Sequence, residues 1–246
     1  EFWGHSFVAD PFGVVLAVAA QAVGWPFPRG GAQALTDALA SYLRSLGGEI
    51  EVNTRVSSID DLRDADAILC DVSPRQLLAM AGHQLPPEYC RQLEAYRYGP
   101  GVFKLDWALS APIPWRAAAC TRTATVHLGG SMEEIAESEL DAWLGHEPQR
   151  PFVILTQPSL FDETRAPEGF HTAWAYCHVP NGSTTDCTEL IERQVERFAP
   201  GFGKVILARN AMTTAALQQH NENLQGGAIN GGVQDFSQLI SRPTRS

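Results

Sequence analysis

Two segments of regular alternation constrain the fold of this chain more than any other feature. In Val102–Leu109, large apolar side chains occupy every second position, and in His171–Val179 small side chains alternate with large ones. Successive side chains of a β-strand point to opposite faces of a sheet, so each segment predicts a strand with two unlike faces. The chain is therefore expected to build a sheet that has one face covered.

The remaining elements follow from helical spacing, capping residues and short apolar runs. Further strands are predicted at Ala124–Leu128, Phe152–Gln157, Lys204–Ala208, Ile50–Val52 and Ala67–Cys70, and Val56 and Ile59 are expected to continue extended. Helices are predicted at Ala32–Leu46, Arg75–Ala81, Pro87–Tyr96, Met132–Leu144 and Thr188–Phe198. This mixture predicts a fold between α/β and α+β, with a mixed sheet and helices packed on one face.

Composition excludes several classes of protein. The 246 residues carry a formal net charge of −10, which argues against a general nucleic-acid binder because such proteins cluster Lys and Arg. Phe12–Val23 is too short to span a bilayer and has the length of a buried helix or an interfacial patch. Five scattered cysteines without a CxxC pair are typical of buried free thiols, so we expect a cytoplasmic location, with peripheral membrane contact as an alternative.

The strand at His171–Val179 holds the candidate substrate pocket. Alternation places Trp174, Tyr176 and His178 on one face, where rings with a phenol and an imidazole suit a large apolar ligand. The alternative is that this face is plain core. Asp106 is expected to be a solvated carboxylate rather than a catalytic base.

Familiar catalytic and metal-binding motifs are absent from the sequence. There is no GxGxxG after a predicted strand, no GxxxxGK[ST], no HExxH and no GxSxG, so no catalytic residue is assigned. His171 and His178 fall on opposite faces of their strand, so no metal site is predicted. The doublets Gly226-Gly227 and Gly231-Gly232 indicate either close backbone approach or a flexible loop.

Taken in order, several stretches resemble the phytoene-desaturase-like family of FAD-dependent oxidoreductases, within the amine-oxidase and glutathione-reductase-like flavoproteins. The resemblance runs through the segments 28–59, 65–68, 98–104, 171–176 and 221–232. It implies a partial Rossmann-like FAD-binding domain at 28–75 and a substrate-binding domain at 76–232. It further implies a substrate-domain segment at 1–27 and a return segment toward the FAD-binding part at 233–246.

The resemblance also implies what this portion of such a protein does. Val56, through its main chain, and Arg55 would approach the adenine end of FAD. The sequence begins at Glu1 without a Met and has neither the GxGxxG unit nor the C-terminal flavin segment of the family. We therefore expect the middle portion of a flavoenzyme, which by itself does not retain FAD.

The function expected from the resemblance is that of a desaturase- or saturase-like oxidoreductase acting on a lipophilic, polyene-type substrate. Whether this chain alone is an enzyme stays open. The alternative is a non-catalytic module that binds an apolar ligand or a protein partner. Self-association is expected in either case, because apolar surface would be uncovered.

Overall fold

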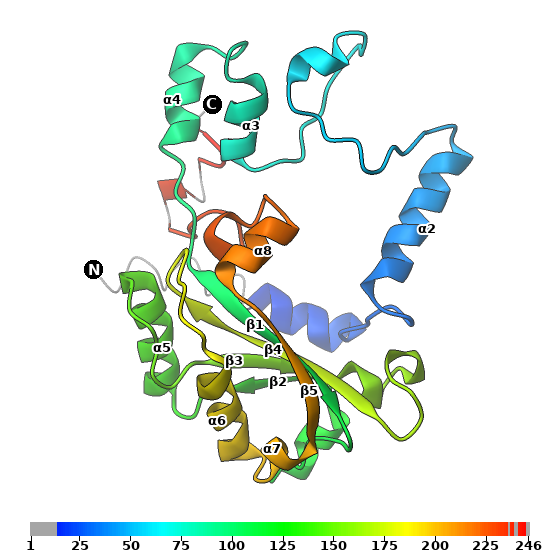
Figure 1. Cartoon of the computed structure of the whole chain (residues 1–246), viewed down its shortest axis with the longest axis vertical. Coiled ribbons are helices and arrows are strands. Elements are labelled where there is room, and N and C mark those ends of the chain that lie inside the picture. Colours follow the sequence, from blue (N-terminus) through cyan, green and yellow to red (C-terminus); the bar gives the residue numbers. More distant parts are fainter. Residues whose placement is uncertain (1–13, 236, 239–240, 245–246) are drawn as a thin grey trace. The chain divides into compact units, whose positions relative to one another are not determined.

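The computed structural model describes residues 14–235, 237–238 and 241–244 (Figure 1). The chain divides into two compact units. The helical unit comprises the described residues of 1–97 and 232–246, and the sheet unit comprises residues 98–231. The functional assignment of the four segments made from the sequence stays a prediction.

The sheet unit is built on one five-stranded sheet. Its strands are β1 (Gly101–Leu109), β2 (Thr125–Leu128), β3 (Val153–Thr156), β4 (His171–Val179) and β5 (Ile206–Met212). They lie in the order β2-β3-β4-β1-β5, and every neighbouring pair is antiparallel. The α+β prediction is thereby confirmed. The expected mixed sheet was wrong, because the connections bring each strand back against its neighbour in the opposite direction.

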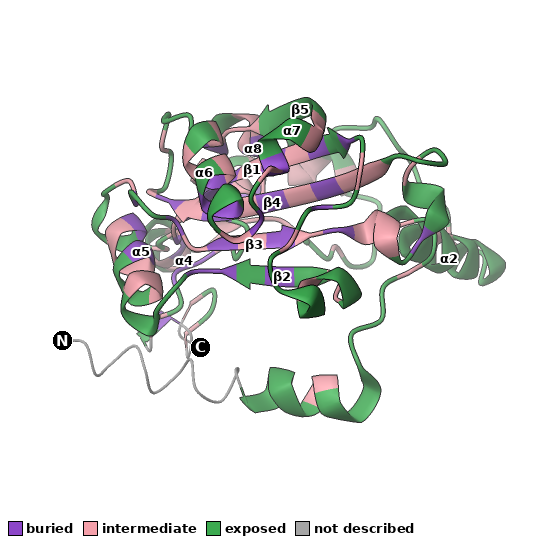
Figure 2. Cartoon of the chain, turned by 90° about the horizontal axis from the view of Figure 1, so that it is seen from below, coloured by how far each residue is buried: buried purple, intermediate pink, exposed green. Residues whose placement is uncertain are grey.

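Strand β4 supplies the small-residue face of the core. Ala173, Ala175 and Cys177 are buried, and in Figure 2 the strand alternates between buried and intermediate residues along its length. Its register pairs Phe103 with Cys177 and Leu105 with Ala175. The large side chains of β1 therefore fill the space above the small ones of β4, which is how a core reaches high packing density.

Two helices contribute to this core. Helix α6 (Thr188–Phe198) buries Ile191 and Val195, and α7 (Phe202–Val205) buries Phe202. The Phe202 ring meets Trp107 edge-on, with ring centroids 5.3 Å apart. Lys204, predicted to begin β5, belongs to α7 instead, so the strand starts two residues later.

The other elements of the sheet unit are short apart from α5 (Met132–Leu144). That helix begins at a capping box of Ser131 and Glu134 and ends at Gly145, whose φ of 87° suits glycine. The rest are α8 (Thr214–His220), η2 (Ala118–Arg122), η3 (Pro158–Leu160), η4 (Glu163–Arg165) and η5 (Gln225–Gly227). The predicted helices at 132–144 and 188–198 are confirmed.

The helical unit contains α2 (Ala32–Ser45), η1 (Ile59–Leu62), α3 (Pro74–Ala81) and α4 (Pro87–Glu94), and residues 14–23 are also helical. Ser73 and Gln76 form the capping box that starts α3, with Pro74 at its first position. The three helices predicted here from the sequence are confirmed, with ends that differ by one or two residues. The helix at 14–23 is mostly exposed rather than buried.

The strands predicted in the helical unit were wrong. Residues 50–52 and 67–70 form no strand, and Ile59 opens a 3-10 turn capped by Ser58. A strand is stable only when a neighbour accepts and donates its backbone hydrogen bonds, and among the described residues none lies beside these segments. The structure therefore does not confirm a Rossmann-like FAD-binding part.

Apolar side chains of the helical unit remain largely exposed. Helix α2 has the expected apolar face, yet none of its residues is buried, and Leu69 is 96% exposed. Cys70 was expected to be buried but is exposed, like the apolar residues around it. Cys177 and Cys187 are buried as predicted. In the described part of the chain, no helix is both long enough and apolar enough to cross a bilayer.

Leu105 and Leu69 form a matched pair for testing where the core lies. Leu105 has no exposed surface, so Leu105→Ala should lower the free energy of unfolding by about 2–5 kcal/mol through lost burial and a residual cavity. Leu69→Ala should change it by less than about 0.5 kcal/mol. Urea unfolding followed by circular dichroism measures both, and similar losses for the two variants would contradict this assignment of the core.

Candidate functional site

The face of the sheet opposite the core carries the sequence-predicted pocket residues. Trp174, Tyr176 and His178 of β4 all lie on it and are half-buried, and none belongs to the core cluster. Their alternation with Ala173 and its small neighbours follows from the two-residue period of the strand. This aromatic face is therefore distinct from the core, and the alternative that it is plain core is not supported.

The rings on the aromatic face form a continuous row. Trp174 and Tyr176 stack, with centroids 6.3 Å apart and planes 15° apart. Tyr176 meets His178 edge-on, with centroids 5.8 Å apart. Such a row presents aromatic surface together with a phenol and an imidazole.

Charged residues of β1 flank this row. Lys104 is paired with Tyr176 in the register and Asp106 with Trp174, so both side chains share the aromatic face. The Lys104 ammonium forms an ion pair with Asp106 and lies 5.5 Å from the Trp174 ring centroid. Asp106 is thus a half-exposed, ion-paired carboxylate, in keeping with the expected solvated role.

Helix α5 adds a carboxylate that the sequence did not indicate. The Oε2 atom of Glu139 lies 2.8 Å from Nδ1 of His178. This contact fixes the orientation of the imidazole and leaves its Nε2 atom as the remaining donor or acceptor. The spacing of Glu139 within α5 gave no signal, because its role depends on where the helix packs.

Burial and the same carboxylate act on the neighbouring phenol. Desolvation raises the pKa of Tyr176, and the nearby negative charge of Glu139 raises it further. The phenol therefore stays protonated and can donate a hydrogen bond. The aromatic face therefore presents a protonated phenol and a carboxylate-oriented imidazole beside the Trp174 ring.

The predicted cofactor residues lie in the other unit. Arg55 is exposed and Val56 half-buried, within an irregular segment of the helical unit. Gly30 and Gly31 precede α2 with positive φ angles, but no strand leads into them. The described residues thus lack a strand–glycine loop–helix unit for a diphosphate, so they do not make up a complete FAD site, and no chemical step is assigned to a flavin.

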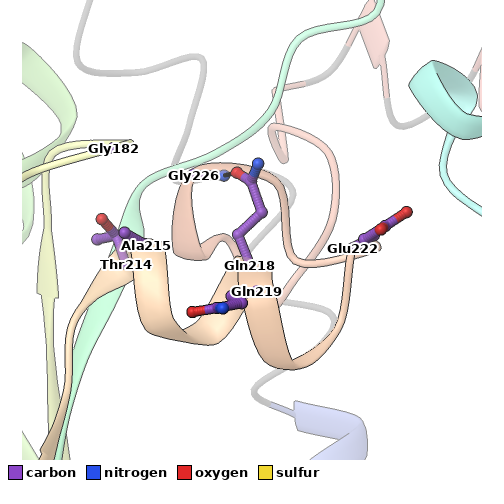
Figure 3. A pocket seen from close by; sticks show the side chains of 7 residues that line it. All are labelled: Gly182, Thr214, Ala215, Gln218, Gln219, Glu222 and Gly226. Carbon is purple, nitrogen blue, oxygen red and sulfur yellow. Dashed lines mark hydrogen bonds between the residues drawn. The ribbon is translucent and has the colours of Figure 1, made fainter.

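A separate polar pocket of about 360 Å³ lies beside α8 and η5 (Figure 3). The side-chain oxygen of Gln218 accepts a hydrogen bond of 2.7 Å from the backbone N–H of Gly226, and Glu222 points away from it. A Cβ on Gly226 would lie 2.1 Å from Oδ1 of Asn181. Of the two interpretations of the glycine run, close backbone approach is therefore correct at Gly226.

Comparison with known proteins gives weak but consistent relationships. No protein-family model matches the chain. Over 89% of its length it is 24% identical to "Pyridine nucleotide-disulfide oxidoreductase domain-containing protein 2" of Rattus norvegicus, and equally to that of Mus musculus. The chain spans 44% of the length of these curated relatives. The proteins that it resembles in sequence are thus oxidoreductase-like.

Two solved structures match part of the chain. An oxidoreductase from Methanosarcina mazei is 16% identical, with a TM-score of 0.47 over 75% of this chain and 42% of its own. The PF1083 protein from Pyrococcus furiosus is 17% identical, with a TM-score of 0.45 over 75% of this chain and 43% of its own.

Glu139 and Glu137 allow a test of the aromatic-face electrostatics. Glu139→Gln removes the charge beside Tyr176 and should lower the pKa of that phenol, which leaves only the upward shift from burial. Glu137→Gln, on an exposed position of the same helix, should leave it unchanged. Ultraviolet titration of tyrosinate, with Tyr176→Phe to identify the signal, measures both. Equal titration curves for the parent and Glu139→Gln would contradict the assigned contact.

Proposed function

We propose that this chain is the substrate-binding portion of an FAD-dependent, desaturase- or saturase-like oxidoreductase. In this proposal the aromatic face contacts a lipophilic, conjugated substrate. The oxidoreductase names of the curated relatives support the general class of reaction. The substrate class and the flavin come from the family resemblance, so both are part of the proposal.

The stacked pair of Trp174 and Tyr176 is the observation that carries the proposal. The sheet already has a complete core on its opposite face, formed by Phe103, Leu105 and their neighbours. Large rings that remain half-exposed outside a finished core are typical of a ligand-binding surface. Their parallel planes suit a flat, conjugated molecule better than a branched one.

In this proposal, the polar side chains of the aromatic face have different roles. Lys104 and Asp106 form a charge pair beside the Trp174 ring, next to which a polar end group of the substrate would lie. His178, oriented by Glu139, can hold or release a proton at Nε2. When bound, a flavin would supply the hydride chemistry, which leaves the protein to bind and orient the substrate.

A conjugated fatty acid tests the aromatic face directly. cis-Parinaric acid should bind the chain and gain fluorescence by energy transfer from tryptophan. Trp174→Ala should weaken binding about tenfold or more, because the stacking surface is lost. Trp25→Ala, which removes an exposed tryptophan of the helical unit, should leave the affinity unchanged.

The same preparation tests the cofactor. Because the sequence contains no GxGxxG unit, FAD mixed with the chain should separate from it on gel filtration. Retention of one FAD per chain would contradict this part of the proposal. Binding of parinaric acid that is indifferent to Trp174→Ala would contradict the aromatic face as the ligand surface.

A second candidate function is an interaction module, and helix α2 favours it. Leu35, Leu39 and Tyr42 lie along one side of this helix and are mostly exposed. An apolar stripe of this kind is typical of a surface that another polypeptide covers. This surface belongs to the helical unit, whereas the aromatic face belongs to the sheet unit.

A further inference from the structure

A second pocket of the sheet unit lies outside the proposed substrate surface. It has a volume of about 310 Å³ and opens beside the edge strand β2 and the C-terminal end of α6. Its apolar lining comes from Trp115, Val126, Leu128 and Phe198. This size lies at the small end of the range for ligand pockets.

Hydrogen bonds hold the Trp115 ring and the backbone at Phe198, two parts of the lining of this pocket. Nε1 of Trp115 donates to Oε1 of the buried Gln157 at 3.0 Å. The Nε2 atom of Gln157 in turn donates to the carbonyls of Cys120 and Thr123, at 2.6 and 2.7 Å. The backbone carbonyl of Phe198 accepts a hydrogen bond from the backbone N–H of Arg116 at 3.1 Å, which ties the two lining segments together. The pocket is therefore preformed, which lowers the entropic cost of binding.

Two arginines line the pocket, and Arg197 is already engaged in an ion pair. Arg197 donates two hydrogen bonds of 3.0 Å to Glu134, and its guanidinium lies 5.2 Å from the Phe198 ring centroid. These bonds, together with the backbone N–H of Ser131 and the guanidinium of Arg150, hold the pKa of Glu134 at about 2. Glu134 is therefore ionised at neutral pH, and its single negative charge is shared between Arg197 and Arg150.

Arg116 is the uncommitted cation of the pocket. Within the described part of the chain, its guanidinium makes no ion pair or hydrogen bond. A guanidinium binds a carboxylate with two parallel hydrogen bonds, and these charge-assisted bonds are stronger than neutral ones. The site thus combines an aromatic and aliphatic lining with an available guanidinium, and His127 lines it as well.

We infer that this pocket binds a small aromatic carboxylate, with the ring between Trp115 and Phe198 and the carboxylate on Arg116. The inference is independent of the proposed substrate surface. Val126 and Leu128, which form the base of the pocket, point to the core face of the sheet, whereas Trp174 is on the aromatic face. Binding at the two surfaces can therefore be separated by mutation.

Isothermal titration with 3-phenylpropionate tests the inference on the full chain. Saturable binding is expected, and Arg116→Gln should weaken it about tenfold or more, because a charge-assisted hydrogen bond is lost. The uncharged analogue 3-phenylpropionamide should lose a similar factor against the parent protein. Ala117→Trp, at an exposed position that lines the pocket, should abolish binding by filling the cavity.

Two control variants make the result specific. Arg122→Gln removes an exposed charge from the neighbouring η2 turn without touching the pocket, and it should leave the affinity unchanged. Trp174→Ala should also leave it unchanged. Absence of saturable binding, equal affinity for the acid and the amide, or an equal loss in Arg116→Gln and Arg122→Gln would overturn the inference. A loss in Trp174→Ala would place the ligand on the aromatic face and overturn it as well.

Discussion

The antiparallel register between β1 and β4 is the constraint on which the rest of the sheet unit depends. It sets Phe103 opposite Cys177 and Leu105 opposite Ala175, so that one face combines large and small side chains into a core. A shift of one residue would send every side chain of β4 to the other face. The same register also places Lys104 beside Tyr176 and Asp106 beside Trp174. The register that forms the core therefore also decides which side chains make up the aromatic face.

Helices α5 and α6 each make a polar contact with a particular strand of the sheet. The carboxylate of Glu139 in α5 orients His178, and the carboxylate of Glu192 in α6 accepts a hydrogen bond of 3.0 Å from Nε1 of Trp107. Trp107 lies in the core, where an unpaired indole N–H would be costly. These contacts position the two helices relative to the strands. They therefore help to decide which side chains line the aromatic face and the pocket beside β2.

The two units show how far a local pattern determines structure. In the sheet unit, alternation at 102–109 and 171–179 predicted both strands and their faces, since each strand has hydrogen-bonded neighbours. In the helical unit, an equally clear alternation at 50–52 produced no strand. The helices at 32–45 and 74–81 formed in that same unit because a helix satisfies its backbone hydrogen bonds internally.

The sequence alone determined the helices α2 to α6, the two-faced strands β1 and β4, and the grouping of Trp174, Tyr176 and His178, because these depend on local spacing. It did not indicate α7 or α8, which are short. It also determined which reactive side chains are present, and it contains no metal-binding or catalytic-triad motif. Only the tertiary structure brought Glu139 to His178, Lys104 to the Trp174 ring and Arg116 to the pocket beside β2. In each case the residues come from different elements. Strand register and helix packing, rather than distance along the chain, decide which of their side chains meet.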